Sequence, residues 1–306
     1  MKRKLIGQGA GGITVTLPIN WVRGYSLTPG AEVDVSEVNE GVLISAAKNK
    51  NEKMITLDLK DYDQRMILNF LNQSYRLGYD TINLTYSSEA QYQVILETTK
   101  ETLLGFEIVE HKKTNCILQN ISEPDPEKFE IILKELFLQI ISLSEKVIED
   151  FQTHKLSLHD LDETKNQIDK LTNYCRRTIL RTPSCETKSI LLYSIISQLS
   201  LASHAYYYIY QYADEKKKKL NPELQFYLIG INQMFRIYYN AFYAKDFNQL
   251  SLMSKFHVQL MQQNQTLFEK STPNTVMFIA YMREIIRAIH LCLPLSLGYW
   301  LGEEAK

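Results

Sequence analysis

The residues that could do catalytic or metal chemistry are scattered along this sequence. It has six histidines, and none falls at the HExxH or HxH spacing that places two imidazoles on one metal ion. The densest polar group lies on one expected helical hairpin and could bind a metal, or it could be a solvated turn whose acids suit a helix start. No serine, cysteine or threonine stands in a nucleophile arrangement, which predicts a protein that is not an enzyme. The hairpin group consists of His154, His159, Asp160, Asp162 and Glu163.

A glycine-rich segment near the N-terminus, Gly7–Gly12, has some likeness to a phosphate-binding loop. A Walker loop requires Gly-Lys-Ser/Thr after its glycines, and here Ile13 follows Gly12. A dinucleotide fingerprint must open a helix, whereas the residues after Gly12 alternate like a strand. The segment is therefore interpreted as a turn, and we expect no bound cofactor.

Two groups of cations lie in the C-terminal half. Arg176, Arg177 and Arg181 share one expected helix, which favours a solvated face or salt-bridge partners over a phosphate clamp. The run Lys216–Lys219 indicates a solvated loop, with contact to an acidic partner or DNA as the alternative. Small residues that recur every third position favour close packing of neighbouring helices over chemistry: Ser194, Ser197, Ser200 and Ser203.

The N-terminal segment is locally basic, although the whole chain has a formal charge of −1. No acidic residue precedes Glu32, and four cations do. Cations position a protein on phosphates, and short polar side chains can read base edges. The predicted DNA-binding residues are Lys2, Arg3, Lys4, Gln8, Thr14, Thr16 and Arg23. The alternative is a tail that is basic by chance.

Length and composition bound the architecture. A chain of 306 residues suggests about two domains, or three small ones, and 45% hydrophobic content is enough to bury a core. Nine of the twelve glycines fall by Gly105, which predicts short strands with tight turns early and long helices late.

Several features favour a cytoplasmic protein. No long apolar run follows Met1–Lys4, so we expect no signal peptide. The cysteines Cys116, Cys175, Cys185 and Cys292 show no CxxC spacing, which argues against a zinc ribbon or a disulfide framework. The uncharged stretch from 189 to 213 is long enough to cross a bilayer, but its serines, glutamines and histidine predict a buried bundle helix without membrane insertion.

Residues 1–48 are expected to form a small β-rich head. Strands are predicted over Gly12–Leu17, Val33–Val38 and Gly41–Ser45, with one helical turn over Ile19–Tyr25. A segment of this size cannot bury a core alone, so we expect a homodimer.

Residues 53–122 are expected to form a small α/β domain of order β-α-β-α-β-β, after a polar linker. Its first helix should be capped by Asp61 and stopped by Gly78, and its second should open at Ser87 or Ser88 and close at Gly105. The predicted strands are Met54–Leu59, Thr81–Tyr86, Phe106–Glu110 and Thr114–Gln119, and the helices are Asp61–Leu77 and Ser88–Leu104.

The remainder, 126–306, is expected to be helical after a boundary at Pro124–Pro126. Pro183, Pro222 and Pro273 are each placed at a helix start, where a missing N–H costs least. The pattern suggests two related three-helix halves. The predicted helices are 127–153, 156–181, 184–214, 222–243, 246–270 and 274–301.

The head resembles the AbrB/SpoVT swapped-hairpin DNA-binding domain over about 45 residues. The resemblance is carried by Gly9-Ala-Gly-Gly-Ile-Thr-Val-Thr-Leu-Pro18, Trp21-Val22, Leu27-Thr-Pro-Gly30, Val33-Asp-Val35 and Gly41-Val-Leu-Ile44. It implies an intertwined homodimer that binds DNA through basic N-terminal strand ends. Family members commonly have lysine after the Leu-Pro, where this chain has Ile19 and Asn20.

The layout of the whole chain resembles archaeal phosphate-uptake regulators of the PhoU family. Asn166-Gln-Ile-Asp-Lys-Leu171 is similar to the family's D-x-x-[I/V]-D-x-L stretch, with Asn166 in place of an acid. Gln198-Leu-Ser-Leu-Ala-Ser-His-Ala205 aligns with L-E-R-I-[G/A]-D-H-A, with Leu199 and Ser203 replacing the two acids. Phe256-His-Val-Gln-Leu260 also lacks carboxylates, so we expect no metal site.

Together these features predict a multidomain protein: a swapped-hairpin head, an α/β middle segment and an all-α, PhoU-like pair of three-helix bundles. The resemblance implies a DNA-binding transcription regulator of phosphate homeostasis. The alternative is a regulator that no longer binds DNA and docks on a phosphate transporter or its sensor kinase.

Overall fold

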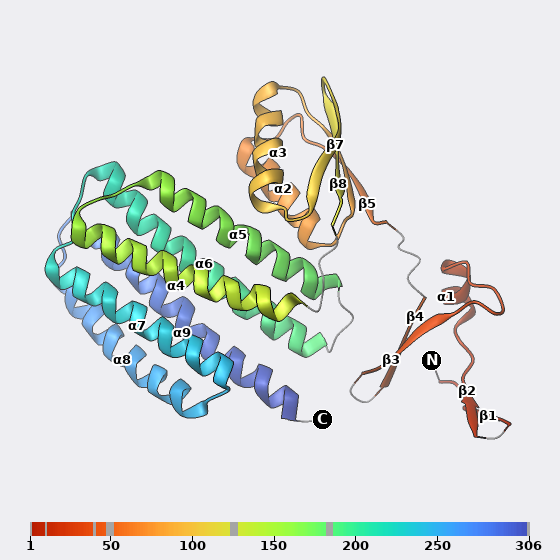
Figure 1. Ribbon diagram of the computed structural model, residues 1–306. Coiled ribbons are helices and arrows are strands. Elements are labelled where there is room, and N and C mark those ends of the chain that lie inside the picture. The colour runs from red at the N-terminus through yellow and green to blue at the C-terminus, as the bar shows by residue number, and fades with distance from the viewer. Residues whose placement is uncertain are drawn as a thin grey trace. The chain divides into compact units, whose positions relative to one another are not determined.

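The chain forms two compact units, Met1–Asn51 and Glu52–Lys306, in a computed structural model (Figure 1). The structure describes residues 2–9, 11–38, 41–46, 52–122, 128–181 and 186–304. The predicted boundary at Pro124–Pro126, the helix start at Pro183 and Cys185 lie outside the described residues. The fold is mixed, with small sheets in the N-terminal part and a helical C-terminal region.

Two antiparallel hairpins and a short helix make up the first unit. Strand β1 (Ile6–Gln8) pairs with β2 (Gly12–Thr14), and β3 (Val33–Val38) pairs with β4 (Gly41–Ala46). Helix α1 (Ile19–Gly24) lies between the hairpins in sequence. The prediction of a strand over Gly12–Leu17 was too long, and β1 was missed because three residues are too few to show alternation.

Among the residues of the first unit whose side chains are described, none is buried. Large apolar side chains are exposed on each of its hairpins, including Ile13 at 68% and Val35 at 62%. The described side chains of a single copy therefore form no hydrophobic core.

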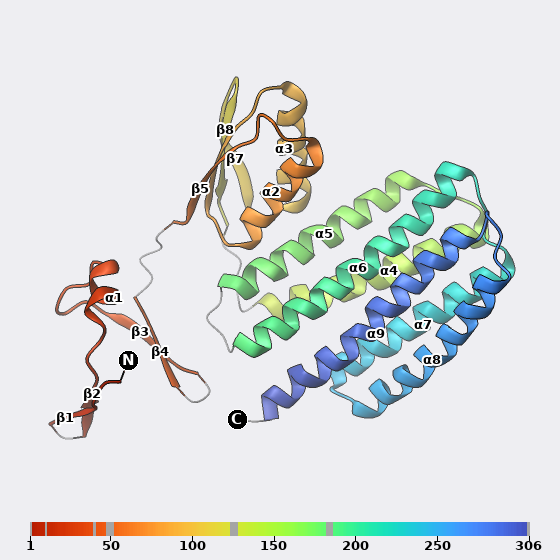
Figure 2. The same ribbon diagram turned by 180° about the vertical axis from the view of Figure 1, so that it is seen from behind.

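In the second unit, a four-stranded sheet carries two helices on one face (Figure 2). The strand order is β5-β6-β8-β7, with β5 parallel to β6 and the other neighbours antiparallel. The order β-α-β-α-β-β is as predicted. The elements are β5 (Met54–Asp58), α2 (Gln64–Arg76), β6 (Thr81–Thr85), α3 (Glu89–Thr102), β7 (Phe106–Lys112) and β8 (Asn115–Asn120).

Local capping explains the ends of these two helices. The prediction that Asp61 caps α2 was wrong, because Asp63 occupies the cap and accepts a hydrogen bond from Met66 N at 2.8 Å. Ser88 caps α3 as predicted, accepting from Gln91 N at 3.2 Å. Gly78 follows α2 with a φ of +83°, a left-handed conformation that suits glycine and ends the helix.

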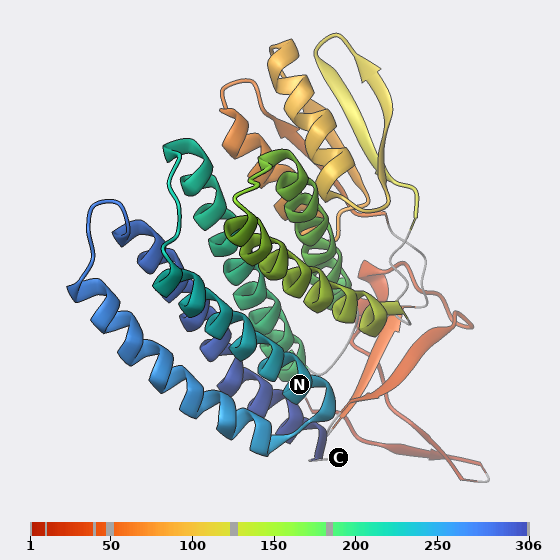
Figure 3. The ribbon, with the colours of Figure 1, turned by 60° about the vertical axis from the view of Figure 1, so that its left-hand side comes forward.

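Six long helices form the rest of the unit in the described part of the chain (Figure 3). Their buried side chains make one continuous core. Helix α6 runs antiparallel along α9, so that Lys188 lies beside Gly302 and Tyr212 beside Phe278. Helix α4 packs on α7 and α5 packs on α6. The helices, close to the predicted ranges, are α4 (Phe129–Thr153), α5 (Leu158–Arg181), α6 (Glu186–Lys216), α7 (Pro222–Ala244), α8 (Phe247–Glu269) and α9 (Val276–Glu304).

Prolines mark the starts of two of these helices in different ways. Pro222 is the first residue of α7, where Asn221 accepts a hydrogen bond from Leu224 N at 2.8 Å. The prediction that Pro273 begins a helix was wrong, because Pro273 lies in the turn before α9, which starts at Val276. Within the described ranges, no helix is both long and apolar enough to span a bilayer.

Candidate functional site

The seven predicted DNA-binding residues are all exposed in the first unit. Lys2, Arg3 and Lys4 precede β1, and Arg23 lies in the last turn of α1. The remaining three lie on or just beyond the β1–β2 hairpin. Exposure leaves all seven accessible to a ligand, and it does not by itself assign one.

The register of the β1–β2 hairpin places two of the predicted base-reading residues on one face. Ile6 pairs with Thr14, and Gln8 pairs with Gly12. Because successive side chains in a strand point to opposite faces, Gln8 and Thr14 share a face and Ile13 lies on the other. The Thr14 hydroxyl donates to the Ile6 carbonyl at 3.3 Å, so it bridges the two strands.

The β3–β4 hairpin has an uncovered apolar face. Val35 is paired with Ile44, and Val33 with Ala46, so these side chains share one face with Val42. Val35 and Val42 are 62% and 59% exposed. The acids of the head begin at Glu32, so the basic and acidic halves of this small unit are separate in sequence.

In the hairpin between α4 and α5, which was considered as a metal site, the polar side chains take part in helix capping, an ion pair and a hydrogen bond. His154 adopts a left-handed φ of 58° at the C-terminal cap of α4. His159 and Glu163 are exposed and 3.8 Å apart. Asp162 accepts a hydrogen bond from the Tyr207 hydroxyl at 2.7 Å. Among the residues that the structure describes, no group of three or more His, Cys, Asp or Glu side chains could hold a metal ion.

Two residues from the PhoU-like motifs, on α5 and α6, contact each other. Asp169 Oδ1 lies 2.9 Å from His204 Nε2, and Asp169 Oδ2 lies 2.7 Å from Lys165 Nζ. Burial alone would raise the pKa of Asp169, but the hydrogen bonds from His204 and Lys165 and their charges hold it below its usual value. Leu199 and Ser203, at the two positions where the resemblance would place acids, are fully buried.

The arginines of α5 form part of the junction between the α/β segment and the helices. The expectation of a solvated face was wrong for Arg176 and Arg177, which are 9% and 0% exposed. The expectation of salt-bridge partners was correct for Arg177 and for Arg181. Its guanidinium donates to the carbonyls of Tyr75 and Tyr79, each at 2.8 Å, and to Asp80 Oδ1 at 2.9 Å. Arg181 also contacts Asp80.

Sequence reasoning missed the acceptor side of this junction. Asp80 lies 97 positions from Arg177 in the chain, and nothing local marks either residue as a partner of the other. Asp80 Oδ2 also accepts from Lys53 N at 3.1 Å, so one carboxylate joins the start of β5 to α5.

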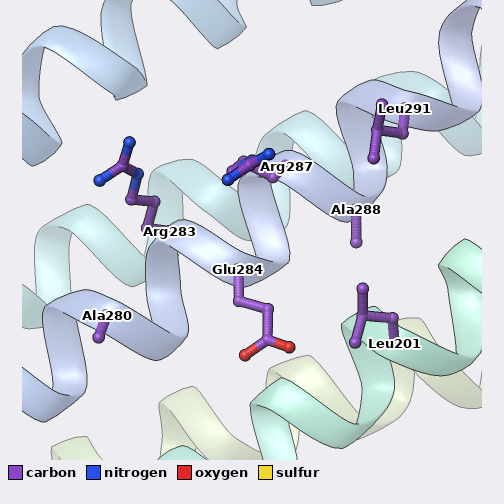
Figure 4. A pocket seen from close by; sticks show the side chains of 7 residues that line it. All are labelled: Leu201, Ala280, Arg283, Glu284, Arg287, Ala288 and Leu291. Atoms are coloured by element: carbon purple, nitrogen blue, oxygen red, sulfur yellow. The ribbon is translucent and has the colours of Figure 1, made fainter.

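A groove of about 390 Å³ lies between α6 and α9 (Figure 4). The side chains of Arg283 and Arg287 lie on one side of the α9 ribbon, and Glu284 extends toward α6. Both arginines are exposed. The lining mixes cations, one carboxylate and apolar groups. The full lining is Leu201, Ala280, Arg283, Glu284, Arg287, Ala288 and Leu291.

No protein-family model, curated protein or solved structure matched this chain in the three comparisons made. The comparisons therefore show no family for it.

Proposed function

We propose that this protein is a homodimeric, DNA-binding transcription regulator of the phosphate-uptake type. Its AbrB-like head would contact DNA, and its PhoU-like helices would act as a sensor or docking module with degenerate metal motifs. One observation carries the proposal: the described side chains of the N-terminal unit include none that is buried, yet apolar and basic ones are presented together.

The lack of a core supports dimerisation of the head. Burying one Val, Leu or Ile side chain contributes about 1.5–3 kcal/mol, and this unit leaves several such side chains exposed. A second copy supplies the same apolar face, which is the geometry of a two-fold interface. The apolar face of β3–β4 is the surface we assign to this contact.

Dimerisation also doubles the cationic patch. The head carries four cations before its first acid, so two copies present up to eight. Each phosphate contact contributes about −0.9 to the log–log slope of affinity against salt, which sets a limit of about −7. Because some cations will face solvent, we expect a slope of about −4 to −6.

The packing of the six helices supports the two-repeat interpretation. The first helix of each half contacts the other, α4 with α7, and so does the last, α6 with α9. The contact between Asp169 and His204 supports the alignment with the family's motifs, because the two motifs would have to face each other.

Fluorescence anisotropy with promoter fragments at several salt concentrations tests DNA binding. Replacing Lys2, Arg3 and Lys4 together with alanine should flatten the slope and weaken binding to all sequences alike. Replacing Gln8 or Thr14 should reduce the difference in binding free energy between operator and random DNA by about 1–3 kcal/mol.

The matched control changes three cations elsewhere. Replacing Lys100, Lys113 and Lys255 with alanine removes the same charge from exposed positions of the second unit and should leave the salt slope unchanged. Binding that is no tighter than to random DNA, with a slope near zero, would refute the DNA proposal.

The groove between α6 and α9 favours one second candidate, docking without DNA binding. Arg283 and Arg287 give it a cationic side, and Leu201 and Leu291 give it an apolar one, so an amphipathic acidic segment of a transporter or sensor kinase would suit it. Replacing both arginines with glutamine should then abolish co-purification with that partner, and the unsubstituted protein should bind DNA with a salt slope near zero.

A further inference from the structure

Four arginines meet where α2 and α5 join the α/β segment to the helices, and within the described chain two of them share one carboxylate. Arg177 and Arg181 both pair with Asp80. Arg76 at the end of α2 and Arg176 on α5 form no ion pair with a carboxylate of the described chain. Arg76 and Arg176 therefore differ from the other two arginines in having no carboxylate partner among the described residues.

Arg76 and Arg176 are held side by side. Arg76 Nε donates to Asn173 Oδ1 at 2.8 Å. Asn173 and Arg176 are three residues apart on α5, a spacing that places them as neighbours on one helix face. Asn173 is itself fixed, because its amide donates to Asn72 Oδ1 at 2.8 Å and to the Thr102 carbonyl at 3.0 Å.

The Arg176 guanidinium is positioned but incompletely bonded. It is 9% exposed, lies over the Tyr193 ring with its carbon 5.5 Å from the ring centroid, and donates to Ser197 Oγ at 3.2 Å. Its Nε is buried without a hydrogen-bond partner. A buried donor on a cation costs free energy unless an acceptor reaches it.

The electrostatics of this pair favour a bound anion. Burial, and for Arg76 also repulsion from Arg176, lowers the pKa of both guanidinium groups, to about 10 for Arg76. Asp169 attracts both, but its two oxygens already bind His204 and Lys165. Guanidinium groups stay protonated near neutral pH, and no carboxylate of the described residues is in direct contact with either arginine.

We propose that Arg76 and Arg176 form a binding site for a small tetrahedral oxyanion, with inorganic phosphate or a phosphomonoester as its chemical class. Planar guanidinium groups match the oxygens of a phosphoryl group and bind it through charge-assisted hydrogen bonds. The anion bridges α2 and α5, so its binding tightens the α/β segment against the helices. This site lies wholly within the second unit and does not depend on DNA binding by the head.

Isothermal titration of the full-length protein with inorganic phosphate, at constant ionic strength in chloride, tests the site. We expect saturable binding and a rise in the unfolding temperature with phosphate concentration. Arg76→Gln and Arg176→Gln should each weaken the affinity at least tenfold. Arg65→Gln is the matched control, because it removes the same charge from an exposed position on α2 and should leave the affinity unchanged.

A second titration and the comparison of variants distinguish the possible results. Titration with a nucleoside monophosphate identifies the source: tighter binding than inorganic phosphate supports a phosphomonoester site, and weaker binding supports a free-phosphate site. A phosphate effect equal to that of chloride, or an equal loss in Arg65→Gln, would overturn the proposal. Phosphate-independent destabilisation of the two variants, with the wild-type affinity retained, would also overturn it and assign the arginines to packing alone.

Discussion

Asp80→Asn is the perturbation that most directly tests the junction. Arg177 is fully buried, and its charge is balanced by Asp80 at 2.9 Å. Removing one partner of a buried ion pair costs about 3–5 kcal/mol, because the other charge stays buried and uncompensated. The carbonyls of Tyr75 and Tyr79 continue to accept from Arg177, so we expect about 3 kcal/mol, the lower end.

Urea unfolding followed by circular dichroism and by Trp300 fluorescence measures this loss. Trp300 is buried in the helical core, and the circular dichroism reports the whole chain. With a slope of about 3 kcal/mol per molar urea, the midpoint should fall by about 1 M. Separation of the two signals in the variant would indicate that the α/β segment has been released from the helices before they unfold.

A control variant and a double variant isolate the contribution of the Asp80–Arg177 ion pair to the free energy of unfolding. Glu110→Gln removes a carboxylate from an exposed ion pair with Lys112 in the same α/β segment, and should leave the midpoint almost unchanged. Asp80→Asn combined with Arg177→Met should be destabilised by less than the sum of the single variants, because the uncompensated charge is gone. A midpoint shift for Asp80→Asn no larger than that of Glu110→Gln would refute the reasoning.

Three further predictions follow from other parts of the chain. Val42→Asp charges the uncovered face of β4 and should convert a dimer to a monomer in light scattering, whereas an unchanged mass would mean that the helical region holds the dimer. Burial and the nearby His290 lower the pKa of His257 from 6.5 to about 4, so the folded chain binds fewer protons than the unfolded chain between these values. Stability should therefore fall as pH drops from 6.5 to 4, and His257→Phe should flatten this dependence in urea titrations; an equal slope in the variant would contradict it. Because Asp169 binds Lys165 and His204, elemental analysis should find less than one tightly held metal ion per chain, and two or more would overturn this.

Periodicity in the sequence was sufficient to predict the long helices. Apolar residues recur at spacings of three and four along α4, and the core-facing residues Leu133, Leu136, Ile140 and Val147 are all buried. Each such pattern is local, because a helix closes its hydrogen bonds within four residues. Short elements carry less information, which is why β1 was missed and Asp61 was chosen over Asp63 as a cap.

The partners across the fold were not predictable in the same way. An apolar stripe shows which face of a helix is buried, but not which element covers it. Asp80 and Arg177 are 97 positions apart, and Asp169 and His204 are 35 apart. Nothing in either local segment identifies the other.

The arginines of α5 show the difference between the two levels. From the sequence alone, Arg177 was expected to be solvated or ion-paired, because burying an unpaired guanidinium is costly. Only the tertiary structure brings Asp80 to Arg177 and, within the part of the chain that it describes, places no carboxylate on Arg176. The sequence by itself determined which segments are helical and which faces are apolar, since these depend on neighbours within a few residues. The tertiary structure decided which charges are neutralised, since that depends on residues brought together from distant parts of the chain.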